Sequence, residues 1–183
     1  CGVQGRTHTE ALQVLFPLER VMAYDVDPVA VNSFQQDISN RLDLEVIPAA
    51  TARDAVTGCD LIVTAGPILK KPHATIQAGW MDEGAFASLV DYDSYWQPAA
   101  MKETDKFCTD DINQFRSAQQ AGYFKDIPEL HADLGELAAN QKPGRHRRGE
   151  PHRACRHARR RPHHPAPLEA SPRQAREVLL VRA

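Results

Sequence analysis

Apolar and polar positions alternate along the first 140 residues with two different periods. In some segments the apolar residues recur every three to four positions, as on one face of a helix, and in others they form short runs typical of buried strands. These patterns predict helices at 7–16, 28–42, 51–56, 110–121 and 128–140. They predict strands at 20–24, 44–47, 60–65, 84–90 and 106–109. The alternation favours an α/β fold with a mostly parallel sheet.

Local signals support the helix starts and the order of the elements. Asp27 can cap the helix at 28–42, and Pro28 suits its first turn. Thr51 can cap the next helix. A glycine turn followed by helix, strand, helix and strand is typical of a Rossmann-like doubly wound parallel sheet. We expect this sheet to be truncated at its first strand, which would precede Cys1.

Composition narrows the class of protein without changing the fold prediction. The chain has 183 residues, of which 42% are hydrophobic and 25% charged, enough to bury a core and to exclude wholesale disorder. No run of 18 apolar residues occurs, so we expect no membrane span. The four cysteines lie far apart and form neither a zinc framework nor a disulfide scaffold, so we expect no metal and a cytoplasmic location.

Charge divides the chain into two predicted segments. Residues 144–183 contain 11 arginines, no lysine and three glutamates, together with five of the eight histidines, whereas the whole chain has a net charge of −2. The preceding part is therefore acidic. We predict a Rossmann domain at 1–143 and a basic, Pro/Arg/His-rich tail at 144–183 that is largely without a stable fold, except for a short helix at 172–181.

The chain opens with a glycine turn that predicts a phosphate site. Gly2, Val3, Gln4 and Gly5 form the second half of a GxGxxG pattern whose first glycine would precede Cys1. Glycines let the backbone approach a pyrophosphate, and the start of the following helix supplies free N–H groups and a positive dipole end. Half of this motif also occurs as an ordinary turn, so the prediction needs support from a second residue.

An acidic residue lies at the expected distance from this turn. Asp25 comes 20 residues after Gly5, at the end of the next predicted strand, where its carboxylate can accept hydrogen bonds from ribose hydroxyls. It would also repel a 2′-phosphate, so NAD is favoured over NADP, although Arg6 could contact such a phosphate. The alternative is an aspartate that merely ends a strand.

Two further positions follow predicted strands. Thr64 and Ala65 end the strand at 60–65 with small residues that leave room for the ribose and nicotinamide side of a cofactor. Asp91 and Asp93 follow the strand at 84–90 and, in an extended chain, would project to the same side. A carboxylate there can transfer protons if its pKa is raised. Two solvated loop carboxylates are the simpler interpretation.

Seven short segments taken together match a known pattern. They are GVQGRTH at 2–8, AYD and DP at 23–25 and 27–28, VTA at 63–65, GA at 84–85 before a strand that leads to Asp93, LGEL at 134–137 and KPGR at 142–145. In these segments, residues 1 to about 145 resemble the ornithine cyclodeaminase/mu-crystallin family. The resemblance implies an NAD(P)-dependent enzyme of two domains, usually a homodimer, of which this chain holds the Rossmann unit.

The family's chemistry is implied by the same resemblance. NAD would take a hydride from the α-carbon of ornithine, the side-chain amine would attack the imine, ammonia would leave, and the hydride would return to give proline. Asp93 falls where the family places its acid/base carboxylate, and the substrate-carboxylate residues would precede Cys1. Asp91 stands where the family usually has glycine. The open alternatives are an NAD-dependent amino-acid or imine dehydrogenase and a non-catalytic NAD-binding module.

The resemblance ends near Arg145, where the family continues with an apolar helix. We interpret the arginine-rich sequence that replaces it as out-of-frame translation of a GC-rich gene. A nucleic-acid-binding arm is the less favoured alternative, because no aromatic residues lie between the arginines to stack on bases. We also expect an exposed central strand edge in the sheet and hence poor solubility.

Overall fold

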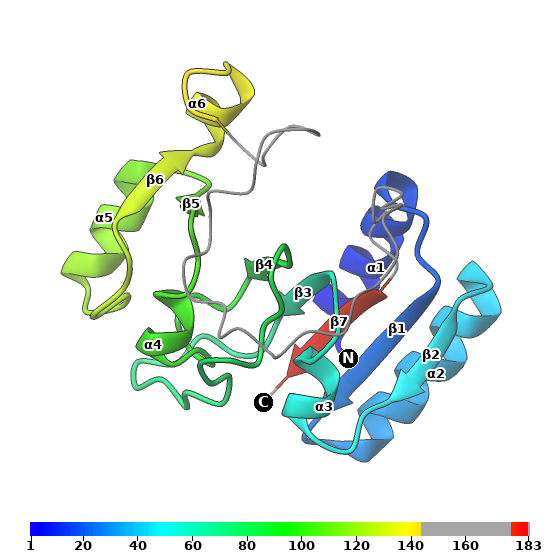
Figure 1. Ribbon diagram of the computed structural model, residues 1–183. Coiled ribbons are helices and arrows are strands. Elements are labelled where there is room, and N and C mark those ends of the chain that lie inside the picture. The colour runs from blue at the N-terminus through cyan, green and yellow to red at the C-terminus, as the bar shows by residue number, and fades with distance from the viewer. Residues whose placement is uncertain (144–176, 183) are drawn as a thin grey trace, which may run out of the picture. The chain divides into compact units, whose positions relative to one another are not determined.

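The computed structural model describes residues 1–143 and 177–182 (Figure 1). These residues divide into two compact units. The first comprises Cys1–Ala100 together with the C-terminal stretch that contains strand β7, and the second begins at Met101. The first unit therefore combines residues from both segments that the charge pattern predicts.

The first unit is a parallel sheet with short connecting helices. Its strands are β1 (Arg20–Asp25), β2 (Glu45–Pro48), β3 (Leu61–Thr64), β4 (Phe86–Leu89) and β7 (Glu177–Arg182). Its helices are α1 (Val3–Leu15), α2 (Pro28–Leu42) and α3 (Ala52–Val56), and α4 (Pro98–Met101) follows at the end of the unit. The strand order is β2-β1-β7-β3-β4, and all pairs are parallel. This is a Rossmann-like doubly wound arrangement, so the predicted fold class is confirmed.

Strand β7 occupies the centre of this sheet. It pairs with β1 over Arg20–Asp25 and with β3 over Leu61–Thr64. The sequence predicts an empty position here and a helix at 172–181. The helix prediction is wrong for 177–181, because those residues belong to β7 and complete the backbone pairing of two neighbouring strands. Residues 144–176, including the first part of that predicted helix, lie outside the described residues.

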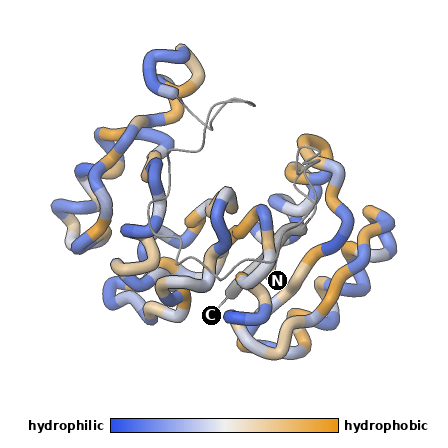
Figure 2. Tube along the Cα trace, viewed as in Figure 1, coloured by the Kyte–Doolittle hydropathy of each residue, from blue (hydrophilic) through white to orange (hydrophobic). Residues whose placement is uncertain are grey.

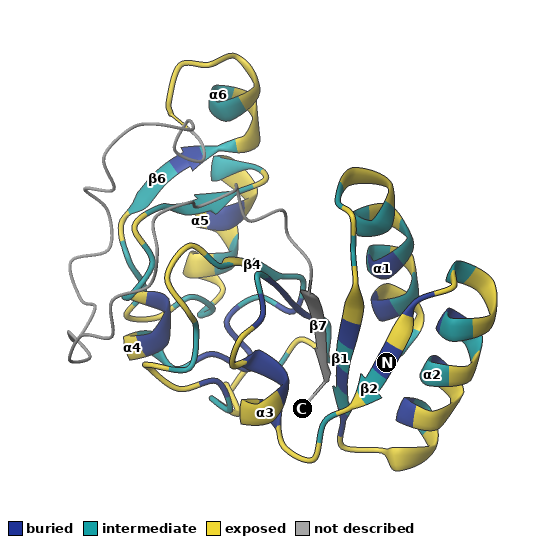
Figure 3. Ribbon diagram, turned by 45° about the vertical axis from the view of Figure 1, so that its right-hand side comes forward, coloured by how far each residue is buried: buried dark blue, intermediate teal, exposed yellow. Residues whose placement is uncertain are grey.

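The core of the first unit lies between the sheet and α2. Val31, Phe34 and Ile38 are buried at helical spacing on α2, and they pack with Val21 and Ala23 of β1. Hydrophobic residues follow one another along β1, whereas α2 alternates between hydrophobic and hydrophilic residues (Figure 2). Figure 3 shows exposed residues along the outer side of α2. Sequence periodicity therefore placed this helix correctly against the sheet.

The helix starts of α2 and α3 are confirmed in detail. The Asp27 side chain accepts a hydrogen bond from the backbone N–H of Val29 at 2.9 Å, and Pro28 takes the first helical position. The Thr51 hydroxyl accepts from the N–H of Asp54 at 3.1 Å. Each cap satisfies a backbone donor that has no partner within its helix.

The second unit is a small α/β unit of its own. It contains β5 (Phe107–Thr109), α5 (Ile112–Gln120), β6 (Leu130–Asp133) and α6 (Leu134–Ala138), with β5 and β6 paired in parallel. The helix predicted at 128–140 is wrong in its first half, since that stretch pairs as β6. Asp133 ends the strand and starts the helix through a reciprocal capping box with Glu136.

Within residues 1–143 and 177–182, none of the helices has the length and apolar character needed to cross a bilayer.

Candidate functional site

The start of α1 presents unused backbone donors. The helix begins at Val3, and its first internal bond runs from the N–H of Arg6 to the carbonyl of Gly2 at 3.2 Å. Its first turn holds no acidic residue, and no side chain among the described residues caps it. The N–H groups ahead of Arg6 therefore have no acceptor within the helix, and they lie at the positive end of the helix dipole. Such an end binds anions.

Gly2 leaves this helix start open. Its backbone has φ −79° and ψ −159°, which other residues also adopt. A Cβ built at Gly2 would meet no protein atom within 4 Å. Neither backbone conformation nor packing among the described residues requires glycine here. The missing side chain instead leaves room for a group that approaches the helix start, as a pyrophosphate would.

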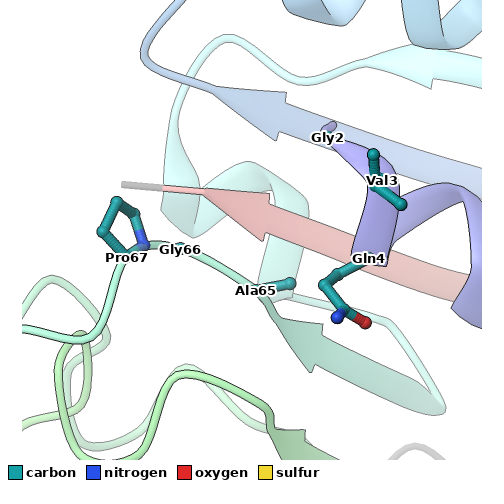
Figure 4. Close-up of a pocket in the computed structure, with 6 residues that line it drawn as sticks. All are labelled: Gly2, Val3, Gln4, Ala65, Gly66 and Pro67. Carbon is teal, nitrogen blue, oxygen red and sulfur yellow. The ribbon is translucent and has the colours of Figure 1, made fainter.

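A pocket of about 230 Å³ opens beside this helix start. One side is formed by Gly2, Val3 and Gln4, and the other by Ala65, Gly66 and Pro67, which follow β3. Figure 4 shows these two segments facing each other. The pocket thus joins the helix start to the carboxyl end of a central strand, where ligands bind in doubly wound sheets.

Asp25 ends β1 close to the glycine turn and is buried. Its Oδ2 lies 3.0 Å from the backbone nitrogen of Cys1, and its Oδ1 accepts a hydrogen bond from the N–H of Asp27 at 3.1 Å. The carboxylate therefore connects the chain ahead of α1 with the start of α2. It lies outside the residues that line the pocket.

Arg6 is directed toward α2. Its Nε donates to Oδ2 of Asp37 at 2.9 Å, and its Nη2 lies 3.1 Å from the Ser33 hydroxyl. The guanidinium also lies over the Phe34 ring, 5.7 Å from the centroid. These contacts hold the side chain that the sequence offers as a possible partner of a 2′-phosphate.

The far wall of the pocket is held by a buried carboxylate. Asp91 is fully buried; its Oδ1 accepts from the Thr64 hydroxyl at 2.7 Å, and its Oδ2 accepts from the N–H of Gly66 at 2.8 Å. The Trp96 indole N–H donates to the same Thr64 hydroxyl oxygen at 3.1 Å. Burial raises the pKa of Asp91 to about 6, and the two donors partly oppose that rise.

The predicted site residues fall into two groups. Gly2, Val3, Gln4 and Ala65 line the pocket. The others do not line it: Gly5 lies within the first turn of α1, Asp25 at the end of β1, Thr64 against Asp91, and Asp93 in the turn after β4. Asp93 is 4% exposed, so it is not the solvated loop carboxylate of the simpler interpretation.

Sequence reasoning missed Gly66 and Pro67 as lining residues and Asp91 as the group behind them. Gly66 and Pro67 directly follow a predicted strand at the sheet edge where ligands bind, which is a usable signal. The contact between Asp91 and Gly66 spans 25 residues and has no local signal. Within the described residues, no cluster of three or more His, Cys, Asp and Glu side chains is arranged to hold a metal ion.

Comparison with known proteins gives a family match over most of the chain. The model of the ornithine cyclodeaminase/mu-crystallin family matches residues 1–150. An alanine dehydrogenase of Archaeoglobus fulgidus is 28% identical over 154 residues, which cover 79% of this chain and 46% of that protein. The chain thus spans about half the length of the curated relatives it matches.

Two solved structures share the fold. The Δ1-pyrroline-2-carboxylate reductase of Thermococcus litoralis, in complex with NADH and L-proline, matches with a TM-score of 0.64 and 21% identity, over 99% of this chain and 50% of that chain. An archaeal alanine dehydrogenase dimer with bound NAD matches with a TM-score of 0.62 and 20% identity, over 100% of this chain and 49% of that chain. At this identity the likeness shows a common fold.

Proposed function

The chain belongs to the ornithine cyclodeaminase/mu-crystallin family, and from that premise we propose that it is the NAD-binding part of an enzyme that oxidises an amino acid or reduces an imino acid. The observation that carries the proposal is the pocket between the open start of α1 and the residues after β3. The relatives named above support the substrate class, because they are an alanine dehydrogenase and a pyrroline-carboxylate reductase.

Residues in the pocket and Asp25 at the end of β1 suit different parts of the cofactor. The N–H groups at the start of α1 would bind the pyrophosphate, and Gly2 would let it approach. Asp25 would accept hydrogen bonds from the adenosine ribose, using the lone pairs that its contacts with Cys1 and Asp27 leave over. Ala65, Gly66 and Pro67 would border the nicotinamide half. When bound, the nicotinamide would accept or return a hydride at the α-carbon of the substrate.

We propose Asp93 as the residue that handles the substrate proton. Oxidation of an amino acid removes a hydride from the α-carbon and a proton from the amine, so a base must accept that proton. Asp93 is buried in the turn that follows β4 at the carboxyl edge of the sheet. In the complete protein, Asp93→Asn should abolish turnover and leave NAD binding unchanged; unchanged turnover would contradict the role.

Ornithine cyclodeamination is the second candidate, and the family match supports it. It would use the same hydride step, followed by ring closure, loss of ammonia and return of the hydride, with no net change in NAD. We also propose a homodimer for the complete protein, as in the archaeal alanine dehydrogenase dimer.

Binding of NAD by the chain is the first test. Calorimetric titration should show binding of NAD, weaker binding of NADP because Asp25 repels a 2′-phosphate, and weaker binding of NAD by Gly2→Val. Absence of NAD binding by a folded chain would overturn the proposal.

Turnover by the complete protein separates the candidates. Net formation of NADH with L-alanine or L-proline indicates a dehydrogenase. Proline and ammonia from L-ornithine without net NADH indicate the cyclodeaminase. NAD binding by the complete protein without any of these products would identify a non-catalytic NAD-binding module and refute the enzymatic part of the proposal.

A further inference from the structure

The turn after β4 forms several hydrogen bonds with the loop that follows β3. The Ser94 hydroxyl accepts from the N–H of Leu69 at 2.9 Å, and the Ser94 carbonyl accepts from the N–H of His73 at 2.7 Å. The Tyr95 hydroxyl donates to the carbonyl of Pro67 at 3.1 Å. The loop that forms one wall of the pocket is therefore built against residues 91–96.

Asp91 is the charged member of this arrangement and reaches closest to the wall. One oxygen accepts from the last residue of β3 and the other from the Gly66 N–H, so one side chain fixes both ends of the short link through Ala65. Ala65 and Gly66 line the pocket, whereas Asp91 lies behind them and lines none of it. Asp91 would therefore affect a ligand only indirectly, by setting the position of Ala65 and Gly66.

Packing alone gives little reason for a carboxylate at this place. Burying an ionised carboxylate is costly unless several donors satisfy it. The Trp96 indole N–H donates to the Thr64 hydroxyl oxygen, so the hydroxyl proton still needs an acceptor, but that acceptor need not be charged. A carboxylate, however, has two acceptor oxygens and can accept from two donors at once. A hydroxyl or an amide has only one acceptor oxygen and is less suited to this arrangement. The group suits the task of holding two backbone segments in one geometry.

We propose that Asp91 is a positioning residue of the cofactor site, which holds Thr64 and Gly66 so that Ala65, Gly66 and Pro67 form the wall for the nicotinamide half of NAD. The inference rests on the proposed function of the pocket. In this inference Asp25 contacts the adenosine half of NAD, whereas Asp91 supports the wall that contacts the nicotinamide half. The two halves of the cofactor should therefore respond differently to substitution.

The test compares NAD with AMP, which lacks the nicotinamide half. Asp91→Asn keeps the size of the side chain but turns one acceptor oxygen into a donor amide. We expect it to weaken NAD binding about tenfold and to change AMP binding less than twofold, measured by titration calorimetry at pH 7.5. AMP binding on the same sample also shows that the variant is folded.

Thr64 gives a second route to the same wall. Thr64→Val removes the hydroxyl and should reproduce the selective loss of NAD affinity, whereas Thr64→Ser keeps the hydroxyl and should bind NAD like the wild type. Thr51→Val, which removes the cap of α3, is a control for general loss of stability and should affect the two ligands equally.

Unchanged NAD affinity in Asp91→Asn, or an equal loss of NAD and AMP, would overturn the inference. Failure of the wild-type chain to bind NAD would instead overturn the proposed function, so the two failures are distinguishable.

Discussion

At the scale of single residues, the two sides of the pocket depend on opposite properties. Gly2 contributes by having no side chain at the start of α1, and Asp91 contributes a buried side chain behind the opposite wall. A substitution of Gly2 should lower ligand affinity and change the stability of the fold little. A substitution of Asp91 should change both, because its carboxylate shapes the pocket wall and is also a buried charge.

A side chain at Gly2 should block the ligand and spare the fold. Gly2→Val places its side chain in the open space at the helix start, so NAD affinity should fall at least tenfold. The free energy of unfolding should fall by about 1 kcal/mol or less, since valine caps a helix less well than glycine. Titration calorimetry and thermal melting measure the two effects.

Gly58 provides the matched control. It has φ +87°, a conformation that favours glycine, and lies outside the pocket. Gly58→Val should therefore show the reverse pattern, a loss of stability with NAD affinity kept. A Gly2→Val protein that binds NAD normally would show that the helix start is not the binding surface.

Asp91 should make the stability of the protein depend on pH. Its folded-state pKa is raised from 3.8 to about 6, so between these values the folded state binds more protons than the unfolded state. Stability from this group is therefore present below pH 4 and is lost as pH rises through 6, by roughly 3 kcal/mol at most. In melts from pH 4 to 8, the stability of Asp91→Asn relative to wild type should rise with pH and level off above pH 7.

The exposed Asp82 offers a control for this measurement, and Asp82→Asn should follow the wild-type curve. A constant difference between Asp91→Asn and wild type across the whole range would contradict the buried charge.

The sequence could identify the acidic turn but not the separate roles of its two carboxylates. Alternation along an extended chain places Asp91 and Asp93 on the same side. The structure breaks that alternation, because Tyr92 between them has φ +61° and residues 90–95 form turns. The partners of Asp91 lie 25 and 27 residues away, so no local pattern could assign them.

At the scale of elements, prediction succeeded where the signal was local. Helix α2 was placed correctly because Asp27 and Pro28 mark its start and its apolar face repeats at helical spacing. Strand β6 was missed because the apolar residues at 128–140 are compatible with a helix or a strand. Its pairing with β5 is what makes residues 130–133 a strand. For 177–182 the pairing of β7 with β1 and β3 likewise outweighs local propensity.

Two loops of the first unit should prove energetically coupled through Gly66. A Cβ at this residue would lie 2.3 Å from the ring of Tyr95, which is itself buried. Gly66→Ala should therefore cost about 1–3 kcal/mol of stability by forcing the ring to move. Tyr95→Leu removes the obstructing ring atoms, so the double variant should be more stable than the sum of the single losses by over 1 kcal/mol. Simple additivity in chemical denaturation would argue against the contact.

At the scale of the whole molecule, the sheet depends on a segment far from its neighbours in sequence. The chain between Pro143 and Glu177 separates β7 from the rest, yet β7 pairs on both sides in the middle of the sheet. The exposed central edge that the sequence predicts is thus covered in the structure. Charge and composition separate residues 144–183 from the rest of the chain, whereas backbone pairing joins β7 to the sheet of the first unit.

Removal of residues 144–183 should disrupt the first unit. Without β7, the facing edges of β1 and β3 lose their backbone partners, so the truncated chain should lose cooperative melting and NAD binding. Adding a peptide of residues 174–183 should restore both in part, and the same peptide with Leu179→Pro should not, because proline removes a backbone donor. A truncated chain that melts like the intact one would contradict the central place of β7.

The position of β7 also sets an order of events during synthesis. The ribosome completes β3 at Thr64 and must add more than a hundred residues before Glu177–Arg182 emerge. At about 5–20 residues per second, β1 and β3 would wait on the order of ten seconds for their shared neighbour. During that interval the nascent chain exposes the unpaired edges of β1 and β3. A chaperone that binds exposed strand edges would therefore act mainly in this period.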